Sequence, residues 1–267
     1  MSTIIKSETS SHWYAADGTP AYGATLREAR KQNLLPSVTT ILKAWPAPQL
    51  EVWKQEQILL AALTMPEAER AKHPDLHELA QSIIASSREE AAKAADWGTR
   101  MHDAVTTYLT TKTAVDGEMG PWLAKFVEWY DANVAKVRLT EQVVVNTDHG
   151  YAGRIDAVVN LKNGQVCLWD IKCRSVKKGK PAVYDSMVMQ LAAYHTCLAR
   201  AGLWCNEFIS MTINRDAPEA PYIYSWSPDE VQEGMDNWAL CRKVWQATLG
   251  RGYSYDPNFE VKEAAHG

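Results

Sequence analysis

The sequence predicts an α/β protein built on a mixed sheet with helices on its faces, and the order of its periodic segments carries this prediction. A long alanine-rich segment, residues 76–112, has the apolar spacing of a helix. Three strand-like runs follow, then a helical segment at 183–201 and a further strand-like run. Helix, three meandering strands, helix and strand is the order of an α/β sandwich with mixed strand pairing.

The remaining elements complete this arrangement. Further helices are expected at 49–64, 121–137 and 228–248, and strands at 141–146, 151–160, 166–172, 208–214 and 222–226. The first 80 residues differ from the rest, because six prolines interrupt short helical patterns such as the one that begins after Ser37, a candidate N-cap. Their apolar residues are too scattered for a separate core. We therefore expect residues 1–80 to form a helical arm packed on a core of residues 81–267.

Composition places the chain among ordinary globular proteins. Apolar residues make up 46% and charged residues 22% of the sequence. The net charge of −4, from 28 basic and 32 acidic residues, argues against a general nucleic-acid binder, because phosphate contacts require positive surface. One segment departs from this balance: residues 172–180 read KCRSVKKGK, with five basic side chains and no acidic one. Such a run is ordinarily a solvated loop, but its position after the strongest motif favours contact with an anion.

Cysteine content and the chain start predict a cytoplasmic protein. The five cysteines are odd in number and include no CxxC pair, which favours free, buried thiols in a reducing compartment. The first ten residues lack an apolar segment behind a basic head, so no secretory signal is expected. No apolar run approaches the ~20 residues of a membrane span.

Three charged residues interrupt otherwise apolar strand patterns. Asp156 lies within one predicted strand, and Asp170 and Lys172 lie two residues apart in the next. Charges in apolar strands are costly to bury unless they are paired or bind a metal. An internal ion pair would explain one acid and Lys172 but would leave the other acid without a partner. A divalent cation between two carboxylates accounts for all three residues.

Three weaker signals accompany these strands, and one of them is Arg154, which lies two residues before Asp156. His102 lies in the long helix one turn after Gly98, which would leave room for the imidazole to reach the sheet. Gln190 and Tyr194 are four residues apart and share one helix face. Taken alone, a helical histidine is more often a core or surface residue, and a polar pair is common on helix flanks.

The motifs resemble, in order and spacing, those of RecB-like nucleases in the PD-(D/E)XK superfamily. They are Gly98-xxx-His102, Gly153-Arg154-Ile155-Asp156, Asp170-Ile171-Lys172 and Gln190-xxx-Tyr194, and they cover about residues 95–215. The chain looks most similar to the small exonucleases of phages and mitochondria. The segment LPSVTTI, residues 35–41, adds to this likeness.

The resemblance implies a restriction-endonuclease-like core and a set of site residues. Mg²⁺, with Mn²⁺ as a substitute, would be bound by His102, Asp156, Asp170 and the Ile171 carbonyl, and Lys172 would be the catalytic lysine. Glu141, at the start of a strand, is a further ligand candidate, although such a residue is ordinarily exposed. Asp170 stands where the superfamily commonly has Glu, and its shorter side chain alters the geometry at the metal. No iron–sulfur cluster is expected, because the four-cysteine spacing that some relatives carry is absent.

The resemblance also implies DNA as the partner, single-stranded or with a free end, and an exonuclease acting in replication, recombination or repair, alone or with a recombination or single-strand-binding protein. The residues expected to contact DNA are Arg154, Arg174, Ser175, Lys177, Lys178, Lys180, Gln190 and Tyr194. Trp13, Trp45 and Trp53 could stack on bases, although core packing is the commoner role of tryptophan.

Two other classes of function remain open. One is a non-catalytic nucleic-acid-binding module on the same fold, which would be expected to lack one of the acids or the lysine. The other is a carbohydrate-active enzyme that uses Asp156 and Asp170 as its carboxylate pair. That alternative leaves Lys172 and the basic segment unexplained.

The turn between the two central strands decides whether the acids can meet. A two-residue turn at Asn163-Gly164 would place Asp156 opposite Ile171 and separate the acids. A three-residue turn over 162–164 would place Asp156 opposite Asp170. We expect the second register, or a bulge that restores it, with Gly164 at positive φ.

Overall fold

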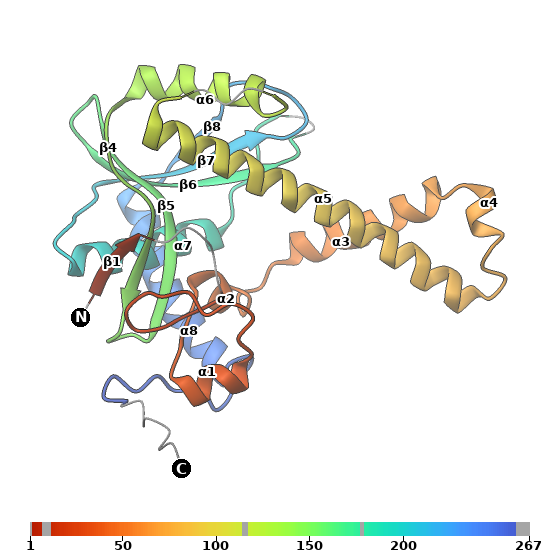
Figure 1. Ribbon diagram of the computed structural model, residues 1–267, viewed down its shortest axis with the longest axis horizontal. Helices are drawn as coiled ribbons and strands as arrows, with labels where there is room; N and C mark the ends of the chain where they lie inside the picture. Colours follow the sequence, from red (N-terminus) through yellow and green to blue (C-terminus); the bar gives the residue numbers. More distant parts are fainter. Residues whose placement is uncertain (1, 7–11, 114–116, 177–178, 260–267) are drawn as a thin grey trace, which may run out of the picture. The chain divides into compact units, whose positions relative to one another are not determined.

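The computed structural model describes residues 2–6, 12–113, 117–176 and 179–259 (Figure 1). The chain divides into two compact units, Met1–Trp45 with Asp103–Gly267, and Pro46–His102. The first unit is an α/β structure with a mixed sheet flanked by helices, which confirms the expected fold class at this level. The boundary that composition placed near residue 80 stays a prediction.

The main sheet has six strands in the order β1-β4-β5-β6-β7-β8. Neighbouring strands are antiparallel except β6 and β7, which are parallel because α7 connects them. The strands are β1 (Ser2–Lys6), β4 (Val134–Asn146), β5 (Tyr151–Leu161), β6 (Val166–Arg174), β7 (Glu207–Asn214) and β8 (Tyr222–Ser225). A second, two-stranded sheet pairs β2 (Trp13–Tyr14) with β3 (Leu35–Pro36).

The helices of the first unit begin where the sequence offers caps. Ser37 accepts a hydrogen bond from the Thr40 N–H at the start of α2, as expected, and Ser227 and Glu230 form a capping box on α8. The helices are α1 (Leu26–Gln32), α2 (Val38–Leu42), α6 (Gly120–Asn133), α7 (Asp185–Arg200) and α8 (Pro228–Ala247). Helix α5 (Leu76–Thr111) runs from the second unit into the first.

Two expectations about the elements were wrong. The helix expected over 121–137 ends at Asn133, and β4 begins at Val134 rather than at residue 141. Polar and apolar residues alternate from Ala135 to Leu139, which favours a strand over a helix. The short strands β1, β2 and β3 were also not foreseen. β1 is stabilised by pairing with β4, which is remote in sequence. β2 pairs with β3 in a segment where prolines obscure the strand pattern.

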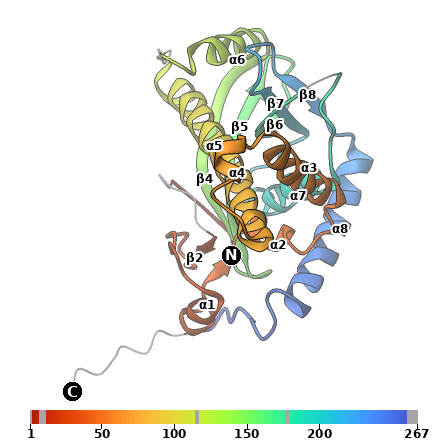
Figure 2. The same cartoon turned by 90° about the vertical axis from the view of Figure 1, so that its right-hand side faces the viewer.

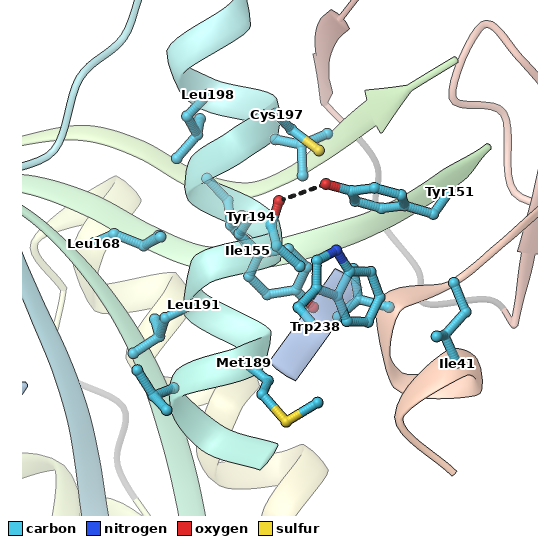
Figure 3. Packing of buried hydrophobic residues seen from close by; sticks show 14 of the residues in the cluster. Ile41, Tyr151, Ile155, Leu168, Met189, Leu191, Tyr194, Cys197, Leu198 and Trp238 are labelled. Atoms are coloured by element: carbon cyan, nitrogen blue, oxygen red, sulfur yellow. Dashed lines mark hydrogen bonds between the residues drawn. The ribbon is translucent and has the colours of Figure 1, made fainter. Parts of the chain in front are cut away.

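Helix α7 packs between the sheet and α8, and it is buried along most of its length (Figure 2). Met189, Leu191 and Leu198 join Ile155 and Leu168 of the sheet in the main core (Figure 3). This packing fixes the position of every side chain on the sheet-facing side of α7.

A second aromatic layer joins β6 to α6 and the last turns of α5. The Trp169 ring lies 6.3 Å from Phe126 and 5.8 Å from Trp129, measured between centroids. Tyr108 of α5 packs edge-on against Phe126 and Tyr130. Since neighbouring Leu168 lies in the core beside α7, β6 is covered on both faces, which explains its nearly continuous apolar sequence.

The second unit consists of α3 (Pro48–Thr64), α4 (Glu67–Arg70) and the first part of α5. The expected helix at 49–64 is confirmed. The Arg70 guanidinium donates to the Ala62 carbonyl, and the Asp75 carboxylate accepts hydrogen bonds from the first backbone N–H groups of α5. These contacts hold the turns between its helices.

The cysteines are free thiols, as expected. Cys167, Cys197, Cys205 and Cys241 are buried and Cys173 is half-buried. Burial raises the pKa of Cys197 and of Cys205 to about 12, so both stay protonated at neutral pH. Within the described part of the chain, no helix combines the length and apolarity that crossing a membrane requires.

The hairpin β5–β6 has the three-residue turn that the sequence predicted. Leu161 donates to the Gln165 carbonyl, and the ladder pairs Val159 with Cys167 and Ala157 with Trp169. Gly164 lies at a φ of 90°. The same register, continued by one residue, places Asp156 opposite Asp170, so the expected register is confirmed.

Gly153→Ala should destabilise the first unit by about 1–3 kcal/mol, the usual cost of overpacking a core. A Cβ at this position would lie 2.6 Å from Cε1 of Tyr194 and 3.3 Å from Val38. Urea unfolding measures the effect. As a comparison, Gly164→Ala meets no atom within 4 Å and should cost about 1 kcal/mol or less, from positive φ alone. Equal losses in the two variants would show that the Gly153–Tyr194 contact is not tight.

Candidate metal centre

The candidate site lies where β5 and β6 part. Beyond the pair Ala157 and Trp169 the ladder between the two strands stops. The Ile171 N–H then donates to Oδ2 of Asp156, with 2.6 Å between N and O. An acidic side chain therefore replaces a strand carbonyl as acceptor. Side chains of α7, β4 and α5 lie close to the two strands at this point.

Asp170 is the most buried acid of the site, with its side chain 3% exposed. Its Oδ2 lies 2.8 Å from Nζ of Lys172, and its Oδ1 accepts a hydrogen bond of 2.8 Å from Nε2 of Gln190. The Gln190 amide oxygen in turn accepts from Nζ of Lys172 at 3.0 Å. The three side chains thus form a closed network in which one amide holds both members of an ion pair.

Two residues of α7 complete this network. The Tyr194 hydroxyl lies 3.2 Å from Nε2 of Gln190 and accepts its hydrogen bond. The pKa of Tyr194 is raised well above its usual value, first by burial and then by Asp170 and Asp156, so the phenol stays protonated. Gln190 and Tyr194 are only 7% and 3% exposed. In this structure they hold the Asp170–Lys172 pair, and their contact with DNA stays a prediction.

Lys172 remains an ammonium ion in this setting. Burial alone would lower its pKa, but the carboxylates of Asp170 and Asp156 outweigh burial and raise the pKa above the usual value. Because the pKa in the folded state is raised, the pairing stabilises the fold at neutral pH and is lost only as pH rises through that raised pKa. Both acids therefore act on the same ammonium, which agrees with their adjacent positions on the hairpin.

Glu141 is a third acid of the site. It lies on β4 between Thr140 and Gln142, which pair with Ala157 and Ile155, so it faces the position of Asp156. Its Oε2 lies 2.8 Å from Nε of Arg154, and its Oε1 accepts from the Thr106 hydroxyl at 3.2 Å. The side chain is 17% exposed, not the exposed group that is ordinary for a glutamate in a strand.

The backbone of Glu141 is in an unusual conformation. Its φ of 50° is left-handed, which costs a non-glycine residue on the order of 1–3 kcal/mol. Strand pairing on both sides maintains this conformation. Conformations of this kind concentrate at functional sites, where the surrounding structure stabilises them.

His102 joins the acids from α5. It precedes Thr106 by one helical turn, so both residues lie on the same face of this helix, which continues without a break into the first unit. One ligand atom each from His102, Glu141 and Asp156 lies within 4.8 Å of the others. All three residues are half-buried. Two carboxylate oxygens and an imidazole nitrogen are a donor set that fits a divalent cation.

Asp170 is not a member of this cluster. Its carboxylate is bound to Lys172 and Gln190, and the Ile171 N–H contributes to the site through Asp156. Ligation by Asp170 and by the Ile171 carbonyl stays a prediction. The sequence had ranked Glu141 below Asp170. The signal that could have raised it is the match in position between Glu141 and Asp156, which becomes visible only once the β4–β5 register is known.

Two of the residues expected to contact DNA, at the end of β6 and just after it, form contacts within the protein. The Arg174 guanidinium donates to the Ala182 carbonyl and lies over the Tyr184 ring, 5.5 Å from its centroid. Ser175 donates to the Asp216 carboxylate. These contacts fix the start of the segment that follows β6.

The other basic residues expected to contact DNA are Lys180, Arg154, Lys177 and Lys178. Lys180 is exposed. Arg154 is paired with Glu141, which places its guanidinium directly beside the site. Lys177 and Lys178 lie outside the described residues.

Trp13 has the core role rather than the base-stacking one. It is 6% exposed, and its ring lies 6.2 Å from Trp245 and 5.5 Å from Tyr253, between centroids. Trp53 of α3 is 40% exposed and Trp45 is half-buried. Base stacking by these two stays a prediction.

Comparison with known proteins gives no family for the chain. No family model matches it, and no curated protein matches its sequence. Several solved structures resemble parts of it, and two of them are as follows. A candidate exonuclease from Eubacterium rectale is 11% identical, with 59% of this chain and 69% of that one covered and a TM-score of 0.41. The protein SSO0001 is 16% identical, with 78% and 89% covered and a TM-score of 0.31. At these TM-scores neither likeness identifies a family or an activity.

Gln190→Leu should destabilise the protein by about 1–3 kcal/mol, because it leaves a buried carboxylate and a lysine without the amide that serves both. Tyr194→Phe removes only the acceptor of one hydrogen bond and should cost about 1 kcal/mol. Guanidinium unfolding of both variants measures the difference. A Gln190→Leu variant as stable as the parent would mean that the network does not hold the site.

Proposed function

We propose that the protein is a metal-dependent nuclease of the PD-(D/E)XK superfamily, in its RecB-like group, and that it hydrolyses phosphodiester bonds of DNA as an exonuclease. The observation that supports this most directly is the pairing of two features. A cluster of His102, Glu141 and Asp156 fits a divalent cation, and beside it Asp170 and Gln190 hold the Lys172 ammonium.

The cation would be Mg²⁺ or Mn²⁺. His102, Glu141 and Asp156 would hold it, and Asp170 would join them if Lys172 moved off its carboxylate. When bound, the cation supplies Lewis-acid polarisation of the phosphate and increases the acidity of water. Oxygen ligands predominate in the donor set, which suits these hard cations better than zinc.

The chain's own residues supply orientation and positive charge. The Lys172 ammonium would stabilise the negative charge that develops on the phosphate, or orient the attacking water, since its raised pKa prevents it from acting as a base near neutral pH. Gln190 fixes the direction of Nζ by accepting one of its hydrogen bonds. Arg154 holds the Glu141 carboxylate in place through their ion pair.

DNA would approach the site along the segment after β6. Exposed Lys180, with Lys177 and Lys178, would contact the phosphate backbone without regard to base sequence, and these contacts would weaken with salt. A free end or single strand is the proposed substrate. Replication, recombination or repair is the proposed setting, together with a recombination or single-strand-binding protein.

The two other classes of function receive less support. A glycosidase needs one carboxyl group of its pair protonated as the general acid. The ammonium 2.8 Å from Asp170 stabilises the ionised form of that residue instead. A non-catalytic DNA-binding module would have no use for a lysine held in this way beside three acids.

Degradation of end-labelled single-stranded and duplex DNA tests the proposal. The protein should release label with Mg²⁺ and none with EDTA. Asp156→Asn should lose both cleavage and Mn²⁺ binding in titration calorimetry, since a hard cation depends on its few anionic ligands. Lys172→Ala should still bind Mn²⁺ but cleave roughly 10²- to 10³-fold more slowly, the effect of removing a transition-state charge stabiliser.

Lys125→Ala is the matched control, because Lys125 is an exposed lysine of α6 whose ion-pair partner among the described residues is Glu128. It should cleave at the rate of the parent. Cleavage in EDTA, or full activity of Lys172→Ala, would contradict the proposed site. Metal-free DNA binding without cleavage would instead identify the non-catalytic alternative.

A further inference from the structure

A hollow of about 150 Å³ lies in the first unit between the turn after β4 and the end of α8. Three stretches of chain form most of its walls: the β4–β5 turn, the last turns of α8, and the segment that follows α8. Ile41 of α2 completes the lining. Its lining residues are Ile41, Thr147, Asp148, His149, Gly150, Arg242, Trp245, Gln246, Tyr253, Ser254, Tyr255 and Pro257. None of these residues belongs to the candidate metal centre.

Arg242 is the basic residue of this lining. Its Nη2 donates to the His149 carbonyl at 2.8 Å, and its guanidinium lies over the Tyr151 ring, 5.5 Å from the centroid. No carboxylate within the described ranges forms an ion pair with it. The guanidinium is therefore fixed in direction by one hydrogen bond and one ring, and its remaining N–H groups are available to a ligand.

The only acid in the lining does not neutralise Arg242. Asp148 forms an ion pair with Arg200 of α7. Within the lining, Arg242 (+1) and Asp148 (−1) sum to zero, so it is the pairing of Asp148 with Arg200, and not a net charge, that leaves the Arg242 guanidinium open to an anion. Burial and the neighbouring Arg242 lower the pKa of His149, so its imidazole adds no charge at neutral pH.

The other polar groups of the lining suit the same kind of ligand. Thr147 and Ser254 carry hydroxyl groups, and Gln246 carries an amide, all of which can donate to oxygen. A planar guanidinium matches two oxygens of a tetrahedral anion. The volume is below that of ordinary small-molecule pockets, which start near 300 Å³, and therefore favours a small group.

We propose that this hollow binds a phosphate group, with Arg242 as its principal ligand and Thr147, Gln246 and Ser254 as supporting donors. The phosphate belongs either to a nucleic-acid strand or to a free phosphate ester. The site shares no residue with the metal centre, so it stands whether or not the protein is a nuclease.

Titration calorimetry with inorganic phosphate, with acetate at equal ionic strength as the reference anion, tests the site. The parent protein should bind phosphate and give no comparable heat with acetate. Arg242→Gln should weaken phosphate binding roughly tenfold or more, since ~1.4 kcal/mol, the scale of one charged hydrogen bond, corresponds to a factor of ten.

Arg242 also packs on Tyr151, so replacing it changes local packing as well as the lining of the hollow. A second variant separates these two effects. Gln246→Glu leaves Arg242 in place, adds a carboxylate to the lining and should weaken binding similarly. Lys243→Gln is the matched control: Lys243 is exposed on the same helix outside the lining, and all three variants change the net charge by −1. It should bind phosphate like the parent.

Competition between phosphate and a short oligothymidylate identifies the source of the bound phosphate group. EDTA is present in this experiment, so no metal-dependent cleavage can occur. If the strand displaces phosphate from the parent, the ligand is a nucleic-acid backbone. If phosphate binds and the strand does not compete, the ligand is a free phosphate ester. Both results support the site. Absence of phosphate binding, equal binding of acetate, or an equal loss in Lys243→Gln overturns it.

Discussion

Where β5 and β6 part, the carboxylate of Asp156 accepts the hydrogen bond of the Ile171 N–H. The other features of the candidate site depend on this substitution of a side chain for a strand carbonyl. It ends the ladder just after Ala157 and Trp169, and it fixes one oxygen of Asp156. Next to this point, Asp170 and Lys172 of β6 both contact Gln190 of α7. The three-residue turn at the other end of the hairpin makes this arrangement possible, because only that register brings the two acids opposite each other.

The charges around this point are arranged in two separate groups. Arg154 compensates Glu141, and Lys172 compensates Asp170, each across 2.8 Å. Asp156 lies between the groups and contributes to the raised pKa of Lys172. A buried acid without such a partner would be protonated or would destabilise the fold. The arrangement places three carboxyl groups and two basic side chains in a small volume, and carboxylate oxygens are the ligands that hard divalent cations prefer.

The sequence predicted the elements that carry their own signal. The bounds of the alanine-rich helix, of the strands on either side of Gly164 and of the helix that contains Gln190 were each predicted to within a few residues. Signals that depend on a distant partner were missed. β1 pairs with the far end of β4, and β2 with β3, so neither is visible in local periodicity. The start of β4 was read as helix, because its alternating pattern directly follows the apolar pattern of α6.

The sequence by itself determined the hairpin and its acids, because a turn of three residues sets the register of the strands it joins through local conformation alone. Only the tertiary structure decided which side chains meet those acids. Glu141 lies close to Asp156 because β4 pairs with β5 and because the backbone of Glu141 is left-handed. No local sequence pattern predicts either feature. Gln190 reaches Asp170 and Lys172 because the packed core beneath α7 sets how that helix lies on the sheet. Such contacts join residues far apart in the chain, and their geometry follows from the packing of whole elements rather than from the residues near each one.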